Sequence, residues 1–207
     1  MLKIHSIKRN IQLLLRYMRY GGNITQINIS KLYHGEMLRD KKIVITGGTS
    51  GIGLAIAEKF IKEGAYVLIT GRDKEKLRKA YTTINSSRLL LMEWDVTNFG
   101  ICEQKVHEAY EKLGNLDVWI NNAGNLDHFQ PTDNFFDKCI DTNLKAIYKI
   151  CPYVINQMTL DGVSYPIRKI LNISSVNGLM NCTNPYYLSK AALNTYTKGL
   201  AKECVNK

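Results

Sequence analysis

Residues 42–53, with the sequence KIVITGGTSGIG, join a short apolar run to a segment with helical spacing. The apolar run is typical of a buried parallel strand, and the following helix begins among three glycines, Gly47, Gly51 and Gly53. Glycines permit a tight turn close to a ligand, and the first amides of a helix have no intrahelical acceptor. The junction therefore suits a phosphate group. Its spacing is G-x3-G-x-G and not G-x-G-x-x-G, so taken alone it equally fits a plain strand–turn–helix connection.

The chain beyond this turn alternates apolar strand patterns with amphipathic helix patterns. We expect further strands at 66–70, 89–94, 117–120 and 169–174, and helices at 74–83, 99–113, 134–158 and 185–203. Such alternation predicts an α/β fold, a doubly wound parallel sheet covered by helices on both faces. Ligands of such sheets bind beyond the carboxyl ends of the strands, where the polar and glycine-rich segments of this sequence lie.

The positive charge is concentrated at the start of the chain. Residues 1–42 carry +7 of the net charge of +10, so the body has little excess charge and we expect no nucleic-acid partner. We divide the chain into a basic N-terminal extension and linker, residues 1–40, and one nucleotide-binding domain, residues 41–207. Within residues 3–19 the apolar positions form a helical stripe flanked by Lys and Arg. This pattern fits weak contact with an anionic membrane surface, or a helix docked on the body or on a second subunit.

The cysteine pattern indicates a reducing compartment. The five cysteines are scattered, odd in number and form no C-x-x-C pair, so we expect free thiols, no disulfide framework and no metal site. No stretch reaches the roughly 18 apolar residues of a membrane span, and the short run 11–15 lies too close to arginines for a secretory signal. We therefore expect a cytoplasmic protein.

Tyr186 and Lys190 stand four residues apart near the start of the last expected helix, which places both on one face. A tyrosine hydroxyl has a reference pKa of about 10, and a nearby ammonium group favours its ionised form, which suits general acid–base work near neutral pH. Ser175 ends the last expected strand and could donate a hydrogen bond to a carbonyl oxygen. A lone Y-x-x-x-K pair, however, occurs by chance in many helices.

Six motifs occur in order, each at the end of an expected element: TGGTSGIG, DVT, NNAG, the asparagine of DTNLKA, NISS and YYLSK. Together they resemble the short-chain dehydrogenase/reductase family over residues 42–202. The resemblance implies a Rossmann-like sheet in three α/β/α layers. It also implies an oxidoreductase that interconverts the carbonyl and alcohol forms of a small molecule by hydride transfer with a nicotinamide cofactor.

The same resemblance implies the roles of individual residues. Tyr186 would protonate the carbonyl oxygen and Ser175 would hold it. Lys190 would support Tyr186 and bind the nicotinamide ribose, and Asn143 would hold a water that feeds protons to Lys190. The implied cofactor contacts are Gly47, Ser50, Gly51, Ile52 and Gly53 around the pyrophosphate, Asp95 and Val96 at the adenine, and Asn122, Ala123 and Gly124 on the adenosine side.

Several residue assignments have alternatives. Ser174 competes with Ser175 for the carbonyl role, although Ser175 fits the family pattern better. Asn122 and Gly124 could simply cap a strand end, and Asn143 could be a polar residue satisfied within its helix.

The end of the second expected strand indicates the cofactor. An NAD-selective site places an acidic side chain there for the ribose 2′-hydroxyl, but this chain has Gly71 followed by Arg72. Arg72 can bind a 2′-phosphate in bidentate fashion, which predicts NADP(H) in preference to NAD(H). The alternative is a solvated loop arginine neutralised by Asp73.

Two features depart from the family pattern. The loop 176–185 is shorter than usual, and the sequence stops at Lys207, so the resemblance implies a sheet that lacks the last strand or strands. We therefore keep a second hypothesis, a truncated, non-catalytic nucleotide-binding or interaction protein. An open apolar strand edge and the apolar face of the last helix also predict a homo-oligomer, or a chain of marginal stability and low turnover.

Overall fold

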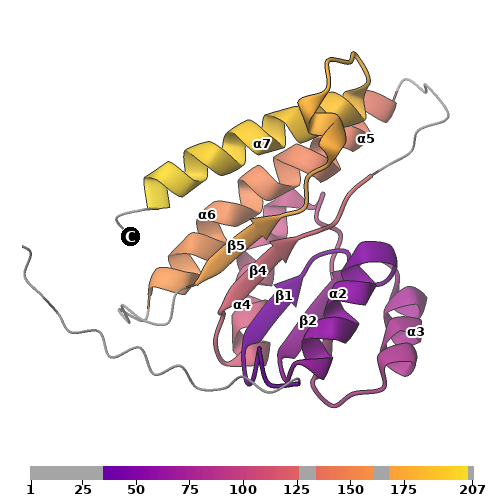
Figure 1. The fold of residues 1–207 in the computed structure, drawn as a ribbon, viewed down its shortest axis with the longest axis vertical. Coiled ribbons are helices and arrows are strands. Elements are labelled where there is room, and N and C mark those ends of the chain that lie inside the picture. Colours follow the sequence, from indigo (N-terminus) through magenta and orange to yellow (C-terminus); the bar gives the residue numbers. More distant parts are fainter. Residues whose placement is uncertain (1–34, 126–133, 161–167, 205–207) are drawn as a thin grey trace, which may run out of the picture. The chain divides into compact units, whose positions relative to one another are not determined.

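The computed structural model describes residues 35–125, 134–160 and 168–204, all within the compact unit that spans residues 33–207. Five parallel strands form one sheet in the order β3-β2-β1-β4-β5 (Figure 1). They are β1 (Lys42–Ile45), β2 (Tyr66–Gly71), β3 (Leu89–Glu93), β4 (Val118–Asn121) and β5 (Lys169–Asn172). The predicted parallel α/β sheet is confirmed.

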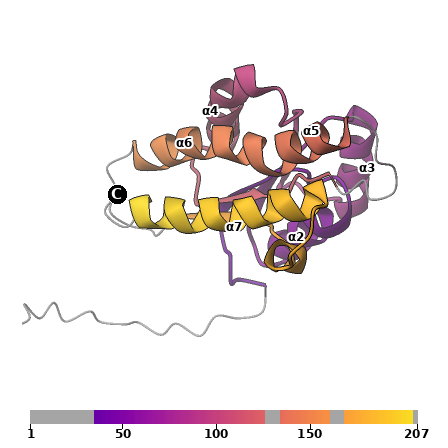
Figure 2. The same ribbon diagram turned by 90° about the horizontal axis from the view of Figure 1, so that it is seen from above.

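Helices cover both faces of this sheet, as Figure 2 shows from above. On one face, α2 (Gly51–Lys62) and α3 (Lys74–Ile84) pack on Ile43, Ile45 and Val67. On the other, α4 (Cys102–Leu113) and α6 (Ala146–Thr159) pack on Val44, Leu68 and Trp119. The final helix α7 (Pro185–Cys204) packs beside α6 through Leu193. The alternation of side chains along each strand thus serves two separate cores, one per face.

The strand order changes direction at β1. The chain runs outward from β1 to β2 and β3, and β4 then pairs on the opposite side, with Ile43 beside both Val67 and Val118. Crossovers leave this point on opposite faces, which opens a crevice beyond the carboxyl ends of β1 and β4. The glycine turn after β1 and the loop after β4 both lie there.

The predicted single helix 134–158 is wrong in one respect, because it is three segments. An α-helix α5 (Phe135–Ile140) leads into a π-helical turn η2 (Asp141–Lys145), and α6 follows. The extra residue of a π turn rotates the side chains that follow it, and such turns are frequent at functional sites. Here the turn carries Asn143, whose side chain is fully buried. Short 3-10 turns, η1 (Phe99–Ile101) and η3 (Val176–Leu179), precede α4 and follow β5.

Some predictions fall outside the described residues. The basic amphipathic segment 3–19, with its proposed membrane or docking contact, lies there, as does most of the linker. Within the described ranges no helix is long and apolar enough to cross a membrane. The same ranges contain no cluster of His, Cys, Asp and Glu suited to a metal ion.

Candidate active site

The glycine turn between β1 and α2 is held in a conformation that favours glycine. Gly47 and Gly51 have φ angles of +64° and +54°, in the left-handed region. A Cβ atom on Gly47 would lie 2.8 Å from the Cα of Ala123, so the loop after β4 packs directly on the turn. Ser50 occupies the N-cap of α2 but makes no side-chain capping bond, and the first turn has no acidic residue. The amides at the start of α2 are therefore left to an outside acceptor.

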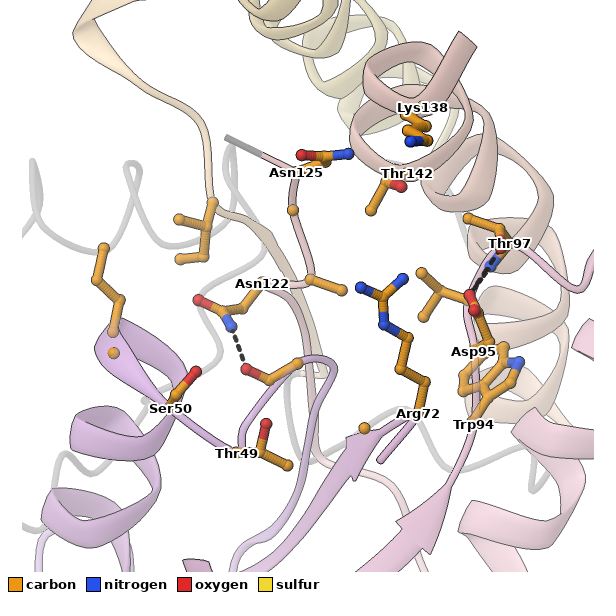
Figure 3. Close-up of a pocket in the computed structure, with 18 of the residues that line it drawn as sticks. Thr49, Ser50, Arg72, Trp94, Asp95, Thr97, Asn122, Asn125, Lys138 and Thr142 are labelled. Atoms are coloured by element: carbon orange, nitrogen blue, oxygen red, sulfur yellow. Dashed lines mark hydrogen bonds between the residues drawn. The ribbon is translucent and has the colours of Figure 1, made fainter. Parts of the chain in front are cut away.

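The loop after β4 is bonded to this turn by side chains from both sides. The Nδ2 atom of Asn122 donates to the carbonyl oxygens of Thr46, at 3.0 Å, and Gly47, at 2.9 Å (Figure 3). In return, the Thr46 hydroxyl accepts from the amides of Asn122, at 3.0 Å, and Ala123, at 3.1 Å. Asn122 therefore does more than cap a strand end. Sequence reasoning missed Thr46, although a threonine between a buried strand and two glycines was a usable signal.

A cavity of about 1000 Å³ lies over the carboxyl ends of the strands. Among the predicted site residues, those that line it are Gly47, Ser50, Gly51, Ile52, Arg72, Asp95, Val96, Asn122, Ala123, Gly124, Tyr186 and Lys190. Gly53, Asn143 and Ser175 are not in its lining. Gly53 lies behind the cavity, where a Cβ atom would meet the Asn122 side chain and lie 2.6 Å from the Gly47 carbonyl oxygen.

The charges around the cavity are not balanced. Four cations line it, Arg72, Lys76, Lys138 and Lys190, and within the described residues none of them forms an ion pair. The acidic residues are already engaged. Asp73 caps α3 by accepting from the Lys76 amide at 3.1 Å, Asp95 accepts from both the amide and the hydroxyl of Thr97, and Asp141 pairs with Lys145 at 3.0 Å. Asp73 therefore does not neutralise Arg72, and the cavity favours an anionic ligand.

Trp94, which directly follows β3, is a lining residue that sequence reasoning missed. Its ring is 3 % exposed and packs edge-on against Trp119, with centroids 6.3 Å apart. Its side chain lies beneath Asp95 and beside Arg72 in Figure 3. Trp94 thus adds an aromatic side chain to the cavity lining next to Asp95, which the resemblance indicated, and Arg72, which the charge argument indicated.

Tyr186 and Lys190 project from the first turns of α7 at the other end of the cavity. Both are buried, at 8 % and 5 % exposure, and the Lys190 Nζ lies 5.8 Å from the centroid of the Tyr186 ring. Lys190 Nζ donates to the carbonyl oxygen of Ile173 at 2.8 Å, which fixes the ammonium group beside the end of β5. Burial lowers the pKa of Lys190 because it disfavours the charged form.

The two adjacent serines after β5 differ in surroundings. Ser174 lines the cavity, and its hydroxyl donates to the Lys190 carbonyl oxygen at 3.5 Å. Ser175 caps η3, where its hydroxyl oxygen accepts from the Asn177 amide at 3.2 Å. The proton of Ser175 is therefore left for another acceptor, while that of Ser174 points to the backbone.

Asn143 is held by the π turn at a fully buried position. Its Oδ1 accepts from the Asn125 amide at 2.7 Å, and its Nδ2 donates to the Asn125 carbonyl oxygen at 3.0 Å and to the Ser189 hydroxyl at 3.1 Å. The side chain is thus satisfied between three elements, and not within its own helix.

Comparison with known proteins places this architecture in a family. The profile of the short chain dehydrogenase family matches residues 41–207. An uncharacterized oxidoreductase of Staphylococcus aureus (strain USA300) is 33% identical over 172 residues, which cover 81% of this chain and 73% of the relative.

Solved structures give the same result. A short chain dehydrogenase from Mycobacterium smegmatis superposes with a TM-score of 0.73 at 25% identity, over 85% of this chain and 76% of that one. An actinorhodin polyketide ketoreductase variant with NADPH superposes with a TM-score of 0.70 at 29% identity, over 79% of this chain and 65% of that one.

The fold and the site define an oxidoreductase of the nucleotide-binding α/β class. The chain belongs to the short-chain dehydrogenase family, whose members bind NAD(P)(H), interconvert carbonyl and alcohol groups of small molecules, and are commonly oligomeric.

Proposed function

We propose that this chain is an NADP(H)-dependent oxidoreductase that interconverts a carbonyl and an alcohol through Tyr186, Lys190, Ser175 and Asn143. The observation that carries the proposal is that one cavity is lined both by the uncapped start of α2 and by the buried Tyr186–Lys190 pair. A phosphate-binding end and a proton-transfer end in a single cavity suit a cofactor and a substrate that react with each other.

The residues around the cavity fit a dinucleotide phosphate. The start of α2 offers amides to a pyrophosphate, and the close packing of Gly47 on Ala123 keeps the backbone within reach. Asp95, whose Oδ1 accepts from the amide and the hydroxyl of Thr97, would contact the adenine. Arg72 lies between these two regions, exposed to the cavity and without an ion-pair partner among the described residues, which favours a ribose 2′-phosphate.

The proton chemistry falls to the chain's own side chains, while the bound nicotinamide would supply the hydride. In reduction, Tyr186 donates its phenolic proton to the substrate oxygen, and Ser175 donates a hydrogen bond to the same oxygen. Lys190, fixed by the Ile173 carbonyl, keeps a positive charge beside Tyr186 and favours loss of that proton. Asn143 donates to Ser189, which lies between Tyr186 and Lys190 in the sequence, and the water that the family resemblance assigns to Asn143 would return protons to Lys190.

Calorimetric titration with NADPH and with NADH, followed by an absorbance screen of carbonyl compounds, tests the proposal. We expect tighter binding of NADPH and loss of its absorbance with at least one carbonyl class. Equal affinity for the two cofactors would contradict the cofactor assignment. Tight NADPH binding with no turnover across the screen would favour the second hypothesis, a non-catalytic nucleotide-binding protein.

A further inference from the structure

Ser189 is a buried hydroxyl that joins two parts of the site but lies outside the cavity lining. It precedes Lys190 on α7, is 0 % exposed, and donates to the carbonyl oxygen of Tyr186 at 2.7 Å. The hydroxyl oxygen of Ser189 in turn accepts a hydrogen bond from Asn143 Nδ2 at 3.1 Å. The Ser189 hydroxyl thus donates one hydrogen bond and accepts another, which fixes its rotation.

The bonds of Asn143 extend this connection to the cofactor side. Asn125 lines the cavity directly after Gly124. The side chain of Asn143 bonds to both the backbone amide and the backbone carbonyl oxygen of Asn125. A Cβ atom on Gly124 would lie 3.3 Å from Asn143 Oδ1, so the loop and the asparagine are closely packed. An unbroken series of hydrogen bonds therefore runs from the loop after β4, through the π turn, to the backbone of Tyr186.

We infer that Ser189 is a positioning residue that couples the cofactor loop to the Tyr186–Lys190 helix. The expected effect on catalysis rests on the proposed function. The hydrogen bonds that couple the loop to the helix do not depend on any activity. Removal of the hydroxyl would leave Asn143 Nδ2 as a buried donor without this acceptor, and Asn143 would relax toward Asn125 or α7. The Tyr186 hydroxyl would then be misplaced relative to the substrate while every lining residue stayed present.

The chain offers a matched control on the same helix. Thr197 lies two turns further along α7, where its hydroxyl donates to the Leu193 carbonyl oxygen at 2.7 Å and accepts from Asn172 Nδ2 at 2.9 Å. None of these three residues lines the cavity. Thr197→Ala therefore removes the same kinds of bond as Ser189→Ala, at a distance from the reacting groups.

The test compares Ser189→Ala, Ser189→Cys and Thr197→Ala with the parent by thermal melting, NADPH titration and steady-state kinetics. We expect similar losses of melting temperature in the two alanine variants. Only Ser189→Ala should lower kcat, by about 10- to 100-fold, because small misplacements of a reacting group have effects of that size. Its NADPH dissociation constant should stay within about threefold, since the hydroxyl does not touch the cavity. In alcohol oxidation, the midpoint of its pH–rate profile should move to higher pH, because Lys190 supports Tyr186 less well.

Ser189→Cys is slightly larger and keeps a weaker donor and acceptor, so its kcat should fall between parent and Ser189→Ala. If Ser189→Ala does not fold, Ser189→Cys provides the comparison of kcat with the parent. Equal loss of kcat in Ser189→Ala and Thr197→Ala, or no loss in either, would overturn the inference.

Hydrogen–deuterium exchange separates this inference from the proposed function. The amide of Asn125, which donates to Asn143 Oδ1, should exchange faster in Ser189→Ala and at the parent rate in Thr197→Ala, whether or not the parent reduces a carbonyl. Failure of the proposed function would appear as absent NADPH binding or turnover in the parent. Unchanged exchange in Ser189→Ala would refute the coupling itself.

Discussion

The charged side chains around the cavity differ in whether a neighbouring group of the protein already binds them. Asp95, Asp73 and Asp141 each bind a partner in the protein, whereas Arg72 has no ion pair within the described ranges. A charged group left without a partner at a cavity wall is a candidate for ligand recognition.

Arg72→Gln should weaken NADPH binding by about tenfold or more and change NADH binding little. A hydrogen bond to a charged group contributes about 1.5–3 kcal/mol, and only NADPH carries the 2′-phosphate that would receive it. The control is Arg78→Gln on α3, where Arg78 pairs with Glu75 and does not line the cavity. Fluorescence titration of both cofactors measures the effect, and a parallel loss for NADH and NADPH would argue against a 2′-phosphate contact.

Ser175→Ala should lower kcat for carbonyl reduction by about 10²- to 10³-fold, the usual effect of losing one donor to a developing oxyanion. Ser174→Ala should lower it less than about threefold, because the Ser174 proton points to the Lys190 carbonyl and not to the substrate. Steady-state kinetics of the two variants distinguishes them. The reverse ranking would assign the carbonyl role to Ser174, the residue that lines the cavity.

At the scale of elements, the loops at the carboxyl ends of β1 and β4 form one bonded unit. Gly53, in the first turn of α2, gives room for the Asn122 side chain that links them. Gly53→Ala should therefore displace the loop after β4 and weaken NADPH binding by about tenfold, with a loss of stability of about 1–3 kcal/mol from overpacking.

Gly199→Ala on α7 is the matched control for that change. A Cβ atom there meets nothing within 4 Å, and alanine favours a helix over glycine by up to about 1 kcal/mol. We expect Gly199→Ala to bind NADPH as the parent does and to melt at the same or a higher temperature. If Gly53→Ala bound NADPH equally well, the proposed role of the glycine turn would be wrong.

Much of the element order was predictable because the spacing of apolar residues along the sequence indicates which positions are buried. The strands of an α/β sheet are buried on both faces, so they stand out as apolar runs. The segments at β2 and α7 match their expected ranges closely. The π turn at Asn143 was not predictable, because it depends on bonds to Asn125 and Ser189, which are distant in sequence. The capping of α3 by Asp73 is different, because it is a local bond to the amide of Lys76 that the N-cap preference for aspartate could have predicted. The position of Trp94 in the cavity lining depends on packing between segments distant in sequence, which the sequence could not show.

At the scale of the whole molecule, the apolar side chains that the described fold leaves exposed are informative. The sheet of the described residues ends on β5, where Leu171 is 41 % exposed, and Leu188 on α7 is 45 % exposed. Tyr148 and Tyr153 on α6 are exposed as well. Apolar strand edges and helix faces of this kind favour association with another chain.

We therefore expect the chain to self-associate or to be only marginally stable. Light scattering over a range of concentrations, combined with a thermal melt, measures both properties. Self-association would appear as a mass that rises with concentration and a melting temperature that rises with it. A monodisperse monomer that melts cooperatively at high temperature would be inconsistent with this expectation.

The hydride-transfer reaction is tested by incubating the chain with a carbonyl substrate and NADPH that carries deuterium at both C4 positions, followed by mass spectrometry of the alcohol. The parent should give labelled alcohol, and Tyr186→Phe should give almost none while its NADPH affinity stays nearly unchanged, because the missing hydroxyl acts on the substrate oxygen. Labelled alcohol formed by Tyr186→Phe at the parent rate would contradict the account.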